Sequence, residues 1–266
     1  MGFLIRFFLR LGLRSRRAVG MMVLGLVPVG FALLLRLMAP ALQDEGIRVS
    51  EHFPQLSFML YLHFLLPVTA LFLGAGVVAD EVDERTLPYL LTRPIPRPAI
   101  IVAKVAAAII TAGAILVFSL VAAYAVLTVG GADGAFGRNL GQLTGAAGAV
   151  LLGMAAYMAF FTLLGGLIKR PVLVGLVFIF GWESAAAFVP AKVKYLTIAH
   201  YLNVLSPPPA PDPGQEPLRA LLNIVLPQQQ ISPAAAGLIL AGIAALFTAA
   251  ASCLLLLKEY RLEQST

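Results

Sequence analysis

Charged side chains are scarce in this sequence. Only 12% of the 266 residues are charged and 60% are apolar, whereas a soluble domain carries about 25% charged and about 45–50% apolar residues. So little charge cannot cover a globular surface, which excludes a soluble globular protein and a disordered chain. Cysteine is nearly absent too, and the single Cys253 cannot close a bridge within the chain. This excludes a disulfide scaffold.

Several motifs of enzyme active sites are also missing. The sequence has no Gly-x-x-x-x-Gly-Lys-Ser/Thr phosphate loop, so we expect that the chain does not hydrolyse ATP by itself. His52, His63 and His200 are not spaced as the paired ligands of a His-Glu-x-x-His zinc site. A Gly-x-Ser-x-Gly elbow is absent, which weakens the case for a hydrolase. We therefore expect neither a metal nor a cofactor bound by this chain.

Long apolar runs, by contrast, are abundant. A bilayer core of about 30 Å is crossed by about 20 helical residues, and the sequence offers six runs of about that length. We predict an all-α integral membrane protein with one membrane domain over residues 1–266. Its predicted spans are residues 18–38, 56–79, 99–129, 142–168, 171–189 and 234–257.

The basic residues indicate the orientation. With six spans both termini lie on one side, and thirteen of the 19 Lys and Arg residues fall on that side. The positive-inside rule places it in the cytoplasm. The net charge of +6 then reflects basic loops at a membrane surface rather than a nucleic-acid site. We predict a multi-pass protein of the bacterial cytoplasmic (inner) membrane with both termini cytoplasmic.

Segments outside the spans carry further patterns. Residues 3–17 form a predicted amphipathic helix, in which four arginines share an arc of about 80° at about 100° per residue; they are Arg6, Arg10, Arg14 and Arg17. Such a helix would lie in the membrane interface, although a basic flank that only orients the first span explains the pattern equally well. Residues 190–233 are predicted to form a small extracytoplasmic cap.

Two polar residues stand out inside predicted spans. Glu183 is the only acid within a span, and a charge at membrane depth usually faces protein or a water-filled cavity. It is a candidate for a translocation path or a subunit interface, with a snorkelling structural acid as the alternative. His63, in the second span, is a weaker candidate, since an interior hydrogen-bonded histidine is the more common case. A stripe of small residues in the fourth span (Gly141, Gly145, Ala149, Gly153) predicts close helix packing within the chain or a dimer contact.

The loop between spans two and three is the most distinctive stretch. Residues 80–98 begin with four acids, continue with a short apolar segment and end in prolines. Thr86 can cap a helix of about two turns that Pro94 ends, presenting Leu87, Leu90 and Leu91. Such a helix is suited to a groove on another protein, although its leucines could instead dip into lipid.

This loop resembles the cytoplasmic loop of ABC transporter permeases of the type-2 exporter class. The residues that match in order and spacing are Thr86-Leu87, Leu90-Leu91, Pro94-Ile95, Arg97 and Lys104. Arg85, Thr92 and Pro96 depart from the family pattern of glycine, serine and serine. The amphipathic segment 3–17 is similar to the interfacial connecting helix of that family.

The resemblance implies a function. In such transporters this loop is a coupling helix that seats in a cleft of a separate nucleotide-binding subunit, which binds and hydrolyses ATP with Mg²⁺. It would make the chain the transmembrane subunit of an ABC transporter that moves or exports a substrate, partnered by a dimer of ATPase subunits and a second permease, by default a second copy of itself. The implied docking residues are Glu81, Asp83, Glu84, Arg85, Thr86, Leu87, Leu90, Leu91, Arg93 and Arg97.

Two other interpretations remain open on the sequence. One is an intramembrane enzyme that acts on a lipid substrate, with Glu183, His63 and His200 as its polar centre. The other is an accessory membrane protein without a transport path. The sequence does not indicate the substrate.

Overall fold

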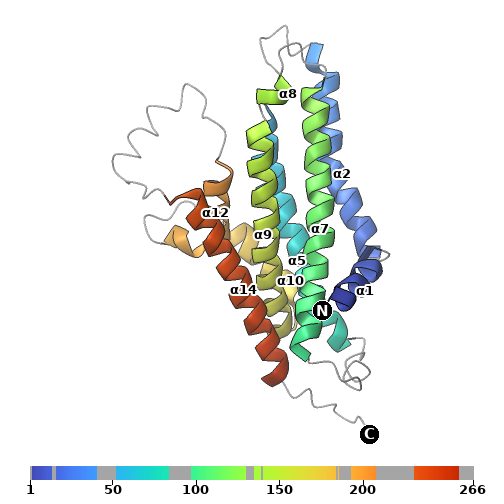
Figure 1. Ribbon diagram of the computed structural model, residues 1–266, viewed down its shortest axis with the longest axis vertical. Helices are drawn as coiled ribbons and strands as arrows, with labels where there is room; N and C mark the ends of the chain where they lie inside the picture. The colour runs from blue at the N-terminus through green and yellow to red at the C-terminus, as the bar shows by residue number, and fades with distance from the viewer. Residues whose placement is uncertain are drawn as a thin grey trace.

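The protein is a bundle of helices standing side by side (Figure 1). The structure, a computed structural model, describes residues 2–13, 16–40, 52–83, 97–129, 135–138, 140–183, 185, 193–207 and 231–257. Within these residues all regular secondary structure is helical, which confirms the all-α prediction.

Five helical stretches are long and apolar enough to cross a membrane. They begin within three residues of five of the predicted spans. Their elements are α2 (Arg16–Leu37), the continuous run of α4 (Phe53–Leu56), η2 (Ser57–Leu65) and α5 (Leu66–Asp83), then α7 (Arg97–Thr128), α9 (Leu140–Leu167) and α14 (Pro233–Leu257). The amino-terminal helix α1 (Gly2–Leu13) and the last turns of α14 lie at the same end of the bundle (Figure 1), which we term the α1 end.

The fifth predicted span, residues 171–189, is described by the structure over its first thirteen residues and at residue 185. Helix α10 (Pro171–Val177) continues as the π-helical η3 (Phe178–Glu183). These thirteen residues extend about 20 Å, less than the bilayer core of about 30 Å; residues 184 and 186–189 lie outside the described part. The helix begins at the predicted residue, Pro171, and residue 185 is helical again; the length of the whole span stays a prediction.

Helices also occupy residues on both sides of two predicted boundaries. The interfacial helix, predicted over residues 3–17, is described as α1 up to Leu13; residues 14–15 lie outside the description, and Arg17 lies in the first turns of α2. The loop predicted over residues 80–98 is shorter, because α5 continues to Asp83 and α7 begins at Arg97. Both predictions placed the span boundary at the last apolar residue, whereas helical hydrogen bonding continues into charged residues outside the bilayer.

The core of the bundle lies where α5, α7 and α9 pack together. Glycines bring α5 and α9 into backbone contact: a Cβ on Gly165 would lie 2.5 Å from the carbonyl oxygen of Ala75, and one on Gly74 would lie 2.9 Å from that of Met158. Small residues permit such close approach in membranes. The α5–α9 pair is therefore the closely packed centre of the bundle.

The predicted small-residue stripe in α9 serves packing within the chain at two of its positions. A Cβ on Gly153 would lie 2.8 Å from the Leu202 side chain, and one on Gly145 would lie 3.5 Å from the carbonyl oxygen of Leu205. Both partners belong to α12 (Ile198–Leu205). With the short helix η4 (Val193–Leu196), α12 forms the described part of the predicted cap.

The helix of the second span is not a regular α-helix. Its segment η2 is π-helical, and the backbone N–H of Leu66 donates to the carbonyl of Tyr61, five residues back. Pro67 follows directly, and a proline ring clashes with the carbonyl four residues before it in an α-helix. The wider π turn gives that ring room, which accounts for the position of η2.

Candidate functional site

The predicted coupling segment connects two helices at the α1 end. The last turn of α5 contains Glu81 and Asp83, and Arg97 is the first residue of α7. Figure 1 shows both helix ends near α1. The docking residues between them lie outside the described residues; they are Glu84, Arg85, Thr86, Leu87, Leu90, Leu91 and Arg93.

The interfacial helix α1 packs on α7, the helix that follows the coupling segment. The ammonium group of Lys104 lies 5.7 Å from the centroid of the Phe8 ring, in a cation–π contact. Phe7 packs edge-on against Phe8, with centroids 5.5 Å apart. Arg6 and Arg10 are exposed, as an interfacial helix requires. The predicted arc is incomplete here, because Arg14 and the side chain of Arg17 lie outside the description.

Glu183 makes a side-chain contact that the sequence did not reveal. The hydroxyl of Tyr157, on α9, donates a hydrogen bond to its Oε2. The backbone N–H groups of Ile198 and Ala199, in the first turn of α12, lie beside the carboxylate, while the buried Oε1 has no hydrogen-bond partner among the described residues. Protein groups replace water around this acid, as a carboxyl at membrane depth needs. The carboxyl thus joins η3, α9 and α12.

The cap helices are fixed by aromatic contacts. The hydroxyl of Tyr201 donates to the carbonyl oxygen of Tyr195 at 2.8 Å, and burial, with a smaller contribution from Tyr195, raises the pKa of Tyr201. The hydroxyl therefore stays protonated at neutral pH and keeps donating. The His200 ring packs edge-on against both tyrosine rings, with centroids 5.0 and 5.4 Å away.

His63 has a local role. Its Nδ1 lies 2.9 Å from the carbonyl oxygen of Phe58, and its ring packs on that of Phe58 with centroids 4.3 Å apart. These contacts stay within η2 and its side chain is exposed. These contacts of His63 are made with Phe58 and not with Glu183 or His200. Nor do the described residues contain a cluster of three His, Cys, Asp or Glu side chains that could hold a metal ion.

A second set of hydrogen bonds links three spans. Ser119, on α7, donates from its Oγ to the carbonyl oxygen of Gly25 on α2. Because the Ser119 hydrogen is used there, the hydroxyl of Tyr61, on η2, donates to the same Oγ at 2.7 Å. A Cβ on Gly25 would lie 3.4 Å from Ile115, at ordinary van der Waals distance, so α2 and α7 pack directly against each other here.

The comparison with protein families identifies the class of protein. The model of the family described as ABC-2 family transporter protein matches residues 9–258, which is nearly the whole chain. This chain belongs to the ABC-2 transporter family. It is a multi-pass transmembrane component of an ABC transporter, and membership implies association with an ATP-binding subunit. The search of curated proteins gave no match.

The ABC-2 permease has functional candidates that sequence reasoning missed. Tyr157, Tyr61 and Ser119 each lie in an apolar span, and each is almost wholly buried. A hydroxyl among apolar residues signals that a partner is needed, but which partner it meets depends on helix rotation and packing. Only the structure shows that Tyr157 reaches Glu183, 26 positions along the chain.

Proposed function

We propose that this permease moves a substrate across the bacterial cytoplasmic membrane, using ATP hydrolysed by a separate subunit that docks on the segment around residues 84–96. The observation that carries the proposal is the arrangement at the α1 end: α5 and α7 flank that segment, and α1 is fixed to α7 there. A docked subunit at this position would act on two spans and on the interfacial helix together.

Contacts between helices would carry a displacement of the docked segment to the opposite end of the bundle. A movement of α5 would reach α9 through the glycine contacts of Gly74 and Gly165. From α9 it would reach η3 and α12 through Tyr157 and Glu183. ATP-driven closure of the motor subunits would thus change the populations of the inward and outward states. In this scheme Glu183 lies on the translocation path or at a subunit interface.

The ATP chemistry in this proposal belongs to the partner. The sequence has no phosphate-binding loop, so ATP and Mg²⁺ would be held by a dimer of nucleotide-binding subunits. The permease would supply only the docking surface and the path.

A second copy of the chain would complete the transporter. Two aromatic side chains of the η2 and η3 helices are exposed and adjacent: Phe64 and Phe180 have ring centroids 6.4 Å apart. Trp182 and Met59, on the same two helices, are also exposed. Because exposed aromatic side chains gather on these two helices, we place the homodimer contact along them.

Docking is tested by Leu90→Asp and Leu91→Asp. A buried, unpaired carboxylate in an apolar cleft costs several kcal/mol, so the variants should lose the ATP-binding subunit. The measurement is affinity purification of the tagged permease, with ATP hydrolysis in the eluate and identification of the co-purified chain that carries a phosphate loop.

The matched control is Leu196→Asp, an exposed leucine of η4 far from the α1 end. It should retain the subunit in wild-type amounts. Equal retention by all three variants would contradict docking through the leucines.

A further inference from the structure

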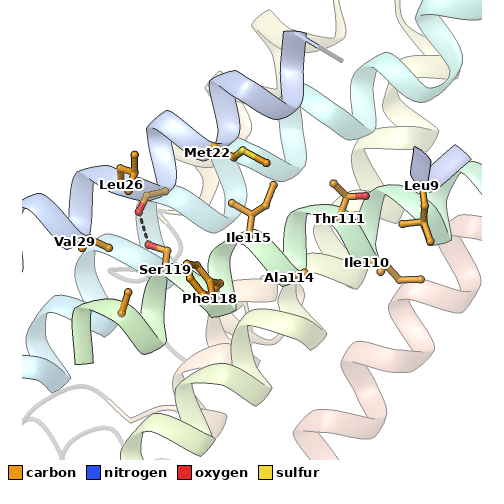
Figure 2. Close-up of a pocket in the computed structure, with 12 residues that line it drawn as sticks. Leu9, Met22, Leu26, Val29, Ile110, Thr111, Ala114, Ile115, Phe118 and Ser119 are labelled. Carbon is orange, nitrogen blue, oxygen red and sulfur yellow. Dashed lines mark hydrogen bonds between the residues drawn. The ribbon is translucent and has the colours of Figure 1, made fainter. Parts of the chain in front are cut away.

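A groove of about 560 Å³ runs between α2 and α7 and reaches α1. Figure 2 shows Met22 and Leu26 of α2 on one side and Ile110 and Phe118 of α7 on the other, with Leu9 of α1 at one end. Phe118 is 78% exposed. The groove is therefore open to the surroundings of the bundle.

The hydroxyl groups that line the groove already donate hydrogen bonds within the protein. Its two hydroxyl side chains are those of Thr111 and Ser119. Thr111 donates to the carbonyl of Ala107 at 2.9 Å, and Ser119 donates to that of Gly25. With both hydrogens used within the protein, the walls favour a hydrocarbon occupant.

The dimensions fit an acyl chain. The α7 wall runs from Ile110 to Ala122, about 18 Å at 1.5 Å per residue, which is close to the thickness of one leaflet, about 15 Å. The groove therefore has the right length for a single acyl chain.

Charge at the mouth favours an anionic headgroup. On a helix with about 100° per residue, Arg6 and Arg10 lie about 40° apart, and both lie within about 100° of Leu9 on one side of α1. Both arginine side chains are exposed. An occupant whose chain passes Leu9 would therefore bring its headgroup near two guanidinium groups, which bind phosphate well.

We propose that this groove binds one anionic phospholipid of the leaflet at the α1 end, with an acyl chain between α2 and α7 and its phosphate at Arg6 and Arg10. The site goes beyond the transport function and does not depend on it. The lipid would link the interfacial helix to the first and third spans. A second copy of the chain is the competing occupant, and the experiment separates the two.

The test measures local lipid preference by tryptophan fluorescence. Trp182 is the single tryptophan, so the Trp182→Phe variant has no tryptophan fluorescence of its own. Phe118→Trp places a probe in the groove, and Leu246→Trp places a control on the lipid-exposed face of α14. The full-length protein is reconstituted with either phosphatidylglycerol or phosphatidylcholine that carries bromine on its acyl chains, diluted in the other lipid without bromine.

The expected result is a preference for phosphatidylglycerol at the groove probe and none at the control. Each arginine at an anionic lipid contributes about fivefold, so Arg6→Gln with Arg10→Gln should reduce the preference to the control value. Ala114→Phe, which fills the groove, should do the same, whereas Ala245→Phe on α14 should not.

Two results would overturn the proposal. Equal preference at both probes, or a preference that survives both arginine substitutions, would show ordinary annular lipid. Weak quenching by both brominated lipids at the groove probe, with strong quenching at the control, would show that protein covers the groove.

Discussion

At the scale of single residues, the polar contacts within the bundle decide which helices belong together. Tyr157 joins α9 to η3 through Glu183, and Ser119 joins α7 to α2 and η2. In a hydrocarbon surrounding, no water is present to form a hydrogen bond with an unpaired hydroxyl or carboxyl group. Each of these contacts therefore selects one packing of its helices over the alternatives.

The first prediction concerns the energy of the Tyr157–Glu183 contact. Tyr157→Phe removes the donor from a buried carboxyl, so stability should fall by about 1–3 kcal/mol. Glu183→Gln tests the other partner. In a double-mutant cycle followed by detergent-induced unfolding, the two changes should be non-additive by about 1 kcal/mol.

Tyr201→Phe is the control for that cycle, since it removes another tyrosine hydroxyl nearby whose bond goes to Tyr195. Its effect should add to that of Glu183→Gln. Function provides a second readout: Glu183→Gln should impair transport, scored by complementation of a deletion strain, while the ATP-binding subunit still co-purifies. Undiminished complementation would remove Glu183 from the path.

At the scale of helices, the α5–α9 contact depends on the absence of side chains. A Cβ on Gly165 would lie 2.5 Å from the carbonyl oxygen of Ala75, and neither backbone can move without disturbing its own helix. The glycine contact thus sets the distance between two spans. It also places Tyr157, two turns earlier on α9, in reach of η3.

The second prediction is that Gly165→Ala destabilises the bundle by about 1–3 kcal/mol, because the added methyl group forces two backbones apart. Gly148→Ala, in the same helix, is the control, since a Cβ there meets nothing within 4 Å. That change should be neutral or stabilise by up to about 1 kcal/mol through helix propensity. Thermal unfolding in detergent measures both, and an equal response would contradict the close contact.

The helices themselves were largely predictable, because lipid leaves a chain few choices. Apolar runs of about 20 residues gave five spans with starts within three residues. What the runs did not show was helix type: the segment η2 beside Pro67 is π-helical, and so is η3. Of the candidate site, the sequence could predict Glu183, because it is the lone acid within a predicted span. It could not predict Tyr157, because nothing in the sequence distinguishes this tyrosine from the other aromatic residues of the spans.

At the scale of the whole molecule, the ends of the helices define two faces. Helix α1, the ends of α5 and α14 and the start of α7 share one face (Figure 1). The basic residues of the sequence predict that this face is cytoplasmic. The cap helices η4 and α12 would then lie toward the outside.

The third prediction tests this orientation by cysteine labelling. Cys253 is the single cysteine, so Cys253→Ser gives a clean background. A cysteine introduced by Leu196→Cys should react in intact cells with a membrane-impermeant maleimide, whereas those from Gly2→Cys and Leu90→Cys should react only after permeabilisation. Labelling in the reverse pattern would invert the orientation.

The fourth prediction tests the homodimer. In the same background, Phe180→Cys should cross-link between two copies through a short bifunctional maleimide, because this exposed ring lies on the proposed contact. Leu246→Cys on α14, which is also exposed, should give only monomers. Cross-linking at both positions or at neither would contradict a contact along η2 and η3.

The π-helical segment η2 beside Pro67 has a consequence for the way the second span can move. Sharp bends in helices occur at prolines and at π-bulges. The second span therefore has a built-in place to bend between η2 and α5, so its α5 half can tilt without turning its η2 half.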